Sequence, residues 1–252
     1  MSHNLAVEAF IAKQPIYDRR RRFLQRAMRA VGGLVCKIEV RGAHHVPQRG
    51  GTILMINHIS AIDPPLLTAV APRYPVTMAK VETLNSLIPR LSVWLWGNFV
   101  VKRGEVDRVA LGISVELIKR GQMLVMAPEG TRNKDGLKQP KDGIAYVAHK
   151  AEAVILPTAI LGVVNWKQNL LSLKRTNALV VFGKPFRFKI APDKPLNKET
   201  RSAMMQEAMY QLALTMPDDY AEFRGDYADL SRATTHYLEF VSPDDATLYP
   251  NR

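Results

Sequence analysis

Short apolar runs alternate with segments of helical periodicity through most of the chain. The clearest apolar runs have the length of buried strands and lie at residues 52–56, 123–127, 154–159 and 178–182. Shorter strand-like segments lie at residues 37–42, 76–79 and 98–101. Residues 106–119 and 199–215 instead place apolar side chains at helical spacing. This alternation predicts an α/β fold with a mostly parallel sheet flanked by helices.

An N-terminal segment, residues 17–35, has helical periodicity and two unlike faces. The apolar face carries Leu24, Ala27, Met28, Val31 and Val35. The opposite face carries Arg22, Gln25, Arg26 and Arg29. Such a helix either packs on the domain as a surface helix or lies in a membrane interface with its arginines on lipid phosphates. The pattern alone leaves both interpretations open.

A second amphipathic segment runs from Leu84 to Trp96. Its leucines fall on one helical face, and Pro89 predicts a kink or an interruption. Trp94 and Trp96 end the segment, and tryptophan favours the membrane–water interface. We expect this segment either to dip into lipid or to cover the sheet.

The composition limits the class of protein. The chain has 252 residues, 47% of them hydrophobic, which suits one sizeable domain with a real core. The formal net charge is +12, so a polyanionic neighbour is expected: nucleic acid, an anionic membrane or a phosphorylated substrate. Composition does not choose among the three.

Cysteine content and hydropathy limit the compartment. Cys36 is the single cysteine, which excludes a disulfide within the chain and a cysteine-based metal site, and fits a reducing compartment. No uninterrupted apolar run reaches the roughly 18–20 residues that a membrane span needs, and charged residues interrupt the N-terminus where a signal peptide would be apolar. The protein is expected to be soluble or to lie on a membrane rather than through one.

Three polar loops follow predicted strands, at residues 57–63, 102–103 and 129–132. In a parallel sheet the loops at the carboxyl ends of the strands converge on one edge, where ligands commonly bind. We therefore expect a histidine, an aspartate, two arginines and a glutamate to meet in one cleft.

His58 and Asp63 are the candidate acid–base pair. On a straight helix two residues five apart point about 140° apart, so the two side chains meet only if the chain bends. A strand-to-helix connection with Asp63 as N-cap and proline after it provides that bend. A carboxylate on one imidazole nitrogen fixes the tautomer and leaves the other nitrogen to accept a proton. The alternative is an ordinary cap beside a satisfied polar histidine.

The sequence favours direct attack by an acceptor hydroxyl over an acyl-enzyme. Ser60 is too close to His58 for an easy triad, there is no G-x-S-x-G elbow, and Cys36 has no obvious nearby base. Arg103 and Arg132 suit a phosphate, because guanidinium groups bind it bidentately. For either arginine alone, a solvated surface charge is the better explanation.

Four blocks in order give the chain a family resemblance. The blocks are Asn57-His58 with Asp63, then residues 97–103 ending in Lys102-Arg103, then Pro128-Glu129-Gly130-Thr131-Arg132, and last Leu156-Pro157-Thr158-Ala159. Together they resemble the glycerolipid acyltransferase family typified by 1-acylglycerol-3-phosphate acyltransferase, over about residues 40–185. Two departures, Ala127 before the third block and Asn133 after it, do not touch the expected chemistry.

The resemblance implies roles for the individual residues. His58 and Asp63 would form the catalytic dyad. The acceptor's phosphate would be held by Arg103, Glu129, Gly130, Thr131 and Arg132. The acceptor would be a lysophospholipid, with 1-acylglycerol-3-phosphate giving phosphatidic acid. The acyl donor would be an acyl-CoA or acyl-carrier-protein thioester, and no metal or bound cofactor is expected.

The resemblance also changes the expected organisation, because the family's substrates are amphiphiles. Residues 1–36 are expected to form an amphipathic membrane-docking segment, residues 37–216 the acyltransferase domain, and residues 217–252 a tail without an assigned role. The expected location is the cytoplasmic face of a membrane, peripheral or monotopic, against an anionic lipid surface.

Three alternatives compete with this interpretation, and no nucleic-acid partner is expected. A nucleic-acid-binding protein would interleave basic and aromatic residues, and no such interleaving is found at 8% aromatic content. A non-catalytic lipid-binding relative would lack the histidine or the acid, and both are present. An acyltransferase of the same mechanism acting on another lysolipid or a glycolipid is compatible with the four blocks.

Overall fold

The computed structural model describes residues 3–85, 87–102, 104, 106–189 and 195–244. Its strands are β1 (Cys36–Arg41), β2 (Thr52–Ile56), β3 (Pro75–Lys80), β4 (Phe99–Val101), β5 (Met123–Met126), β6 (Val154–Leu161), β7 (Thr176–Phe182), β8 (Phe186–Phe188) and β9 (Leu238–Phe240). Its α-helices are α1 (His3–Ile11), α2 (Gln14–Val35), α3 (Asp63–Val70), α4 (Leu87–Trp96), α5 (Arg108–Lys119), α6 (Gly143–Ala151), α7 (Trp166–Leu171) and α8 (Lys198–Leu214). Strands and helices alternate along most of the chain, as the hydrophobic pattern predicts.

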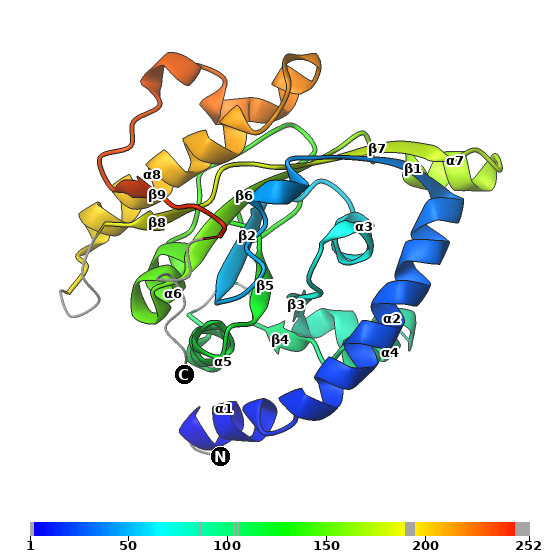
Figure 1. The fold of residues 1–252 in the computed structure, drawn as a ribbon, viewed down its shortest axis with the longest axis horizontal. Coiled ribbons are helices and arrows are strands. Elements are labelled where there is room, and N and C mark those ends of the chain that lie inside the picture. Colours follow the sequence, from blue (N-terminus) through cyan, green and yellow to red (C-terminus); the bar gives the residue numbers. More distant parts are fainter. Residues whose placement is uncertain (1–2, 86, 103, 105, 190–194, 245–252) are drawn as a thin grey trace.

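The strands form one sheet in the order β1-β7-β6-β2-β5-β3-β4 (Figure 1). β2 lies between β5 and β6 and pairs with both in parallel. β3 continues the parallel part next to β5, and β4 follows it. β7 and β8 are antiparallel to β6, and β1 pairs in parallel with β7. The prediction of a mostly parallel sheet flanked by helices is confirmed.

Two apolar layers cover the two faces of the sheet. Successive side chains of β2 alternate between them: Ile53 and Met55 join the layer under α1, α5, α6 and α8, whereas Leu54 and Ile56 join the layer under α3. All five residues of β2 are buried, which explains why the four residues after Thr52 are all apolar rather than alternating. The loop after β2 therefore starts from a rigid, central position.

Helix α2 is oriented against the usual rule for an amphipathic helix. Its buried residues are polar, namely Gln14, Arg21 and Gln25. Phe23 and Leu34 are 72% and 77% exposed. The buried side chains bond to backbone oxygens of the domain, as with Gln25 Nε2, which donates to Thr68 O at 3.0 Å. Leu24, Met28 and Val35 are partly buried beside them, so only part of the apolar side of α2, with Phe23 and Leu34, lies in solvent.

Arg21 joins α2 to the end of α4. Its guanidinium donates to Trp96 O at 2.6 Å and to Gly97 O at 2.7 Å, at the end of α4. It also donates to Gln14 Oε1 and to Asp18 Oδ1. The ring of Tyr17 packs on Gly97, where a Cβ atom would lie 2.2 Å from Tyr17 Cγ. α2 is thus joined to the segment that leads into β4.

Residues 218–244 pack onto the same body. A 3₁₀ segment (Asp218–Tyr227) buries Tyr227, and β9 buries Leu238 and pairs with β8. The buried carboxylate of Glu207 on α8 accepts hydrogen bonds from the Thr234 hydroxyl and from the N–H groups of His236 and Tyr237. The C-terminal segment up to residue 244 closes one face of the fold.

The predicted elements differ from the structure in a few places. The pattern predicts none of α1, α7, β8 and β9, which are short or, for the two strands, only three residues long. α4 runs through Pro89 without ending, because the third residue of a helix has no intrahelical N–H bond to lose. Among the described residues, the structure contains no helix that is both long and apolar enough to cross a bilayer.

Candidate active site

The His58 and Asp63 side chains meet at the edge of the sheet. His58 Nδ1 lies 2.8 Å from Asp63 Oδ2. The carboxylate is fully buried, and the imidazole is slightly exposed. A carboxylate only accepts, so Nδ1 carries the proton and Nε2 is left to a bound group.

The bend that joins the two residues differs from the predicted one. The sequence predicts Asp63 as the N-cap, but α3 begins at Asp63, with Ile62 at the cap position and no side-chain cap bond. The carboxylate turns back instead, and Oδ2 accepts the N–H groups of Ile59 and Ser60, each at 2.8 Å. The loop is therefore wound around the carboxylate, which fixes the position of the histidine.

Asn57 holds the start of this loop against the neighbouring strand. Its side-chain amide donates to Ile160 O at 2.9 Å and accepts from Ile160 N–H at 2.7 Å. Both atoms of the amide are thus used on the backbone of β6, and the side chain is buried. Asn57 acts as a structural residue that sets where His58 leaves β2. An asparagine directly after four apolar strand residues is the sequence signal for it.

The loop after β5 lies directly against the histidine loop. Asn133 N–H donates to His58 O at 2.8 Å, and Lys141 N–H donates to Pro128 O at 2.8 Å. Gly130 has φ +69°, in the left-handed region that favours glycine. These bonds bring the first and third sequence blocks together, as the convergence of strand ends predicts.

Glu129 is the buried member of that loop. Burial raises the pKa of its carboxyl, while the N–H of Lys138, the side chain of Asn133 and the nearby His58 act in the opposite direction. Its Oε1 accepts Lys138 N–H at 2.6 Å. In the described part of the chain, the hydrogen-bond partners of Glu129 are the N–H of Lys138 and the side chain of Asn133.

The remaining candidate phosphate-binding residues lie at different depths. Gly130 lines the same cavity as His58. Thr131 and Arg132 are exposed and do not line it. Arg103 falls outside the described residues. The structure therefore brings His58, Asp63, Glu129 and Gly130 together and leaves Thr131 and Arg132 on the outer side of the loop.

A cavity of about 930 Å³ opens beside His58. Its basic lining side chains are Lys102, Arg108, Lys141 and Arg201. Its apolar lining side chains include Met78, Val101, Val106, Leu111 and Ile144. An apolar wall with a few cations around a histidine suits an amphiphilic anion. Sequence analysis missed Arg108, Lys141 and Arg201, which come from three separate elements or loops.

Lys141 is the cation closest to the glycine of the third block. A Cβ atom on Gly130 would lie 3.2 Å from Lys141 Nζ and 3.3 Å from its Cδ and Cε. The absence of a side chain at Gly130 therefore gives the lysine stem its path across the loop. Arg201 is held differently, since its Nε donates to Asp142 Oδ2 at 3.3 Å and its Nη1 to Leu196 O at 2.6 Å.

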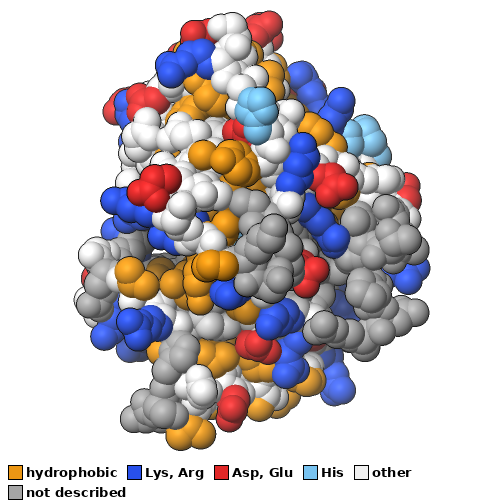
Figure 2. Space-filling view, turned by 90° about the vertical axis from the view of Figure 1, so that its left-hand side faces the viewer, with side chains coloured by type: hydrophobic (Ala, Val, Ile, Leu, Met, Phe, Trp, Pro, Cys, Tyr) orange, Lys and Arg blue, Asp and Glu red, His pale blue; other side chains and the backbone are white. Residues whose placement is uncertain are grey.

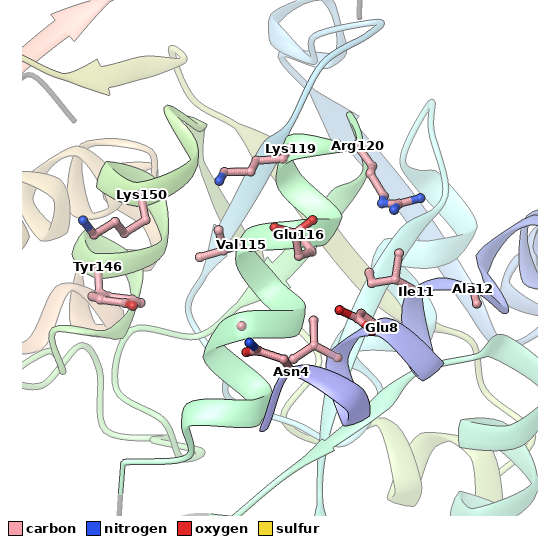
Figure 3. A pocket seen from close by; sticks show the side chains of 12 residues that line it. Asn4, Glu8, Ile11, Ala12, Val115, Glu116, Lys119, Arg120, Tyr146 and Lys150 are labelled. Carbon is pink, nitrogen blue, oxygen red and sulfur yellow. The ribbon is translucent and has the colours of Figure 1, made fainter. Parts of the chain in front are cut away.

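A second, open groove of about 640 Å³ lies where α1 meets α5 and α6 (Figure 3). It shares Gly112 and Tyr146 with the larger cavity. Figure 3 shows side chains of both charges around it, with Glu8 on α1 below Arg120, the residue just after α5. Figure 2 shows the side of the molecule that lies on the left in Figure 1, where hydrophobic side chains are exposed among Lys and Arg. Because it holds His58, the larger cavity is the candidate active site.

The donor set of the site favours proton transfer and anion binding. Among the described residues, no cluster of three or more His, Cys, Asp or Glu side chains could hold a metal ion. An imidazole with one nitrogen on a buried carboxylate can accept a proton from a hydroxyl in the cavity through the other nitrogen. The surrounding lysines and arginines can hold a phosphate while it does so.

Known proteins resemble the chain over this part of the fold. A family model described as Acyltransferase matches residues 37–161. Over 125 residues the chain is 33% identical to 1-acyl-sn-glycerol-3-phosphate acyltransferase alpha of Ovis aries and of Homo sapiens, covering 48% of this chain and 44% of each relative. It is 28% identical over 133 residues to 1-acyl-sn-glycerol-3-phosphate acyltransferase of Borreliella burgdorferi, covering 52% of this chain and 53% of that relative. The chain thus spans about half the length of the curated relatives it matches.

A solved structure extends the likeness to most of the fold. The crystal structure of the 1-acyl-sn-glycerophosphate (LPA) acyltransferase PlsC from Thermotoga maritima aligns with a TM-score of 0.56 and 18% identity. The alignment covers 82% of this chain and 92% of that one. At this identity the alignment shows a shared fold.

Proposed function

Since the chain belongs to the acyltransferase family over residues 37–161, we propose that it is an O-acyltransferase of phospholipid biosynthesis. It moves a fatty acyl group from a thioester to the free hydroxyl of a lysophospholipid. The acceptor we propose is 1-acylglycerol-3-phosphate, and the product is then phosphatidic acid. The named relatives support this acceptor. The observation that carries the proposal is the 2.8 Å pair of His58 and Asp63 beside a cavity with basic and apolar walls.

His58 is the proposed general base. Its Nε2 takes the proton of the acceptor hydroxyl as the oxygen attacks the thioester carbonyl. The tetrahedral intermediate then collapses, the carbon–sulfur bond breaks, and the sulfur leaves with the proton that the imidazolium returns. Asp63 holds the tautomer and stabilises the imidazolium through Oδ2. General-base help of this kind is worth roughly 10²–10⁴-fold in rate.

The acceptor's phosphate is proposed to bind on the loop after β5 and at the end of β4. Gly130 and Lys102 line the cavity there, and Arg103, Thr131 and Arg132 are the further candidates from the family pattern. Thr131 and Arg132 would reach the phosphate from the outer side of the loop. Glu129 is a poor phosphate ligand itself, and its buried bonds support a role in shaping the loop.

The proposed site of action is a membrane surface, which we expect to be the cytoplasmic face. The outward apolar side of α2, with Phe23 and Leu34, supports membrane docking by residues 1–36. Trp94 on α4 is also exposed, and the guanidinium of Arg20 lies 5.1 Å from its ring. The net charge of +12 favours an anionic leaflet. An acyl-CoA or an acyl-carrier-protein thioester is the proposed donor.

The first test incubates purified protein with lysophosphatidic acid and long-chain acyl-CoA in detergent micelles, repeated with an acyl-carrier-protein donor, and compares wild type with His58→Ala. We expect wild type to make phosphatidic acid with one of the donors and the variant to lose at least about a hundredfold of the rate. A folded wild type that makes no product contradicts the proposed acceptor. Equal rates for wild type and variant contradict the proposed base.

A further inference from the structure

The connection between β6 and β7 presents leucines to solvent. Leu171 and Leu173, at and just after the end of α7, are 85% and 96% exposed, and Leu170 is exposed as well. A soluble surface usually scatters single apolar side chains, whereas three leucines within four residues at the tip of a projection form a local patch. We refer to residues 165–175 as the α7 tip.

Hydrogen bonds of the chain itself hold the α7 tip in this shape. Lys174 N–H donates to Asn169 O at 2.8 Å, and Leu173 N–H donates to Leu170 O at 3.1 Å. The Asn169 side chain donates to Thr176 Oγ1 at 3.2 Å. Leu173 takes φ +55°, a conformation that leucine rarely adopts. The exposure of the leucines is therefore fixed by a folded turn rather than by a frayed end.

The charge of the α7 tip has one sign. Lys167, Lys174 and Arg175 lie within it, and the sequence contains no Asp or Glu from residue 153 to residue 192. Trp166 begins α7, with Lys167 Nζ 5.8 Å from the centre of its ring. Leucines at an apex, cations behind them and a tryptophan alongside are the composition of a segment that enters an anionic lipid interface.

The α7 tip adjoins the outward apolar side of α2. β1 follows α2 directly, β7 follows the α7 tip directly, and the two strands pair in parallel with Cys36 opposite Thr176. Arg175 Nη2 donates to Cys36 O at 2.8 Å. Figure 1 shows α7 at the end of the sheet where α2 runs into β1. Leu34, two residues before Cys36, therefore ends the exposed side of α2 next to the last residues of the α7 tip.

We propose that the α7 tip is a second lipid contact that inserts Leu170, Leu171 and Leu173 into an anionic bilayer. α2 and the α7 tip then dock the molecule at two points of one continuous surface. The choice of lipid as the occupant rests on the proposed function, on the one-signed charge and on the continuity with α2. A second copy of the chain is the other occupant that a patch of this size admits.

Tryptophan fluorescence tests the insertion directly. The chain has three tryptophans, so the variant Trp94→Phe/Trp96→Phe leaves Trp166 as the single reporter on α7. With vesicles containing phosphatidylglycerol we expect a blue shift of the emission and quenching by lipids brominated near the top of the acyl chain. We expect both signals to be much weaker with pure phosphatidylcholine vesicles. Vesicle binding without quenching of Trp166 would overturn the proposal.

A substitution series tests the energetic part. We expect Leu171→Ser/Leu173→Ser to lower the partition coefficient on anionic vesicles at least about tenfold and to leave the melting temperature unchanged, because the side chains contact little of the fold. Leu214→Ser, at an exposed leucine ending α8, is the matched control and should bind as wild type does. If the double variant binds vesicles as wild type does, the proposal is contradicted. The proposal is also contradicted if the double variant loses only self-association, measured by sedimentation velocity, because the patch would then bind a second copy of the chain. These binding experiments contain neither acyl donor nor acceptor, so their result does not depend on whether the protein is active in the acyltransferase assay.

Discussion

Two fully buried charges, Arg21 and Asp63, hold two different parts of this molecule. Arg21 donates to four oxygens and joins α2 to the end of α4. Asp63 accepts from three nitrogens and holds the loop that carries His58. Both side chains are 0% exposed. The same device, an ion surrounded by partners of the opposite polarity, places a surface in one case and a proton-transfer group in the other.

The two charges differ in how fully they are satisfied. An unpaired ion in a core costs several kcal/mol, and partners offset that cost. Burial lowers the pKa of Arg21, and the nearby Asp18 opposes that shift. Asp63 uses Oδ2 for all three bonds, while Oδ1 is buried without a partner among the described residues. Asp63 thus concentrates its bonds on one atom, as suits a group that must orient a histidine.

The largest effect is expected from Asp63→Asn. The amide can still accept one bond, but it carries no charge to stabilise the imidazolium. We expect kcat to fall by roughly 10²–10⁴-fold, measured with lysophosphatidic acid and the active donor in micelles. Vesicle binding should stay as in wild type, because α2 is not touched. A variant with wild-type kcat would show that the buried carboxylate only shapes the loop.

Arg21→Met tests the second buried charge, which joins α2 to the end of α4. The carbonyls of Trp96 and Gly97 lose their donors, and we expect the free energy of unfolding to fall by about 3–5 kcal/mol, measured by urea denaturation. Arg22→Met is the matched control, since Arg22 is the exposed neighbour and should change stability by less than about 0.5 kcal/mol. Equal stabilities for the two variants would mean that the bonds of Arg21 contribute little.

Lys141→Met extends the comparison from the buried charges Arg21 and Asp63 to an exposed cation beside the cavity. Losing one charge-assisted contact to a phosphate should raise KM for lysophosphatidic acid roughly tenfold and change kcat little, with partial recovery in Lys141→Arg. KM for a monoacylglycerol, which lacks the phosphate, should not change. Lys138→Met is the control, because Lys138 is an exposed lysine of the same loop that faces Asp226. An equal rise for both acceptors would point to a structural role.

The sequence was sufficient for the mostly parallel part of the sheet, though not for β8 and β9, and for the pairing of His58 with Asp63. Apolar runs such as 53–56 have few structural options, and parallel strand ends converge wherever the strands are ordered. The sequence did not predict that the Asp63 carboxylate turns back to the preceding loop. An Asp followed by proline is compatible both with an N-cap and with this arrangement. Local sequence favours the commoner of the two.

The orientation of α2 and the basic residues of the cavity were beyond a sequence pattern. An amphipathic pattern gives a helix two faces but does not say which one faces the domain. Here Arg21 and Gln25 face inward because they donate hydrogen bonds to backbone carbonyls of α4 and α3. Arg108 and Arg201 reach one cavity from α5 and α8 only through the tertiary fold. Strands of three residues, such as β9, owe their pairing to contacts far along the chain.

The joint between α2 and the body matters for protein engineering. A shortened protein that starts at residue 37 keeps the whole region matched by the family model, yet it loses the guanidinium that covers the end of α4. It also strips Val7 and Ile11 of α1 from the apolar layer beneath α5. Residues 1–36, which look in the sequence like a detachable anchor, therefore pack on the domain as part of the fold. To weaken membrane binding, replacing the exposed leucines one at a time is a better strategy than removing this segment.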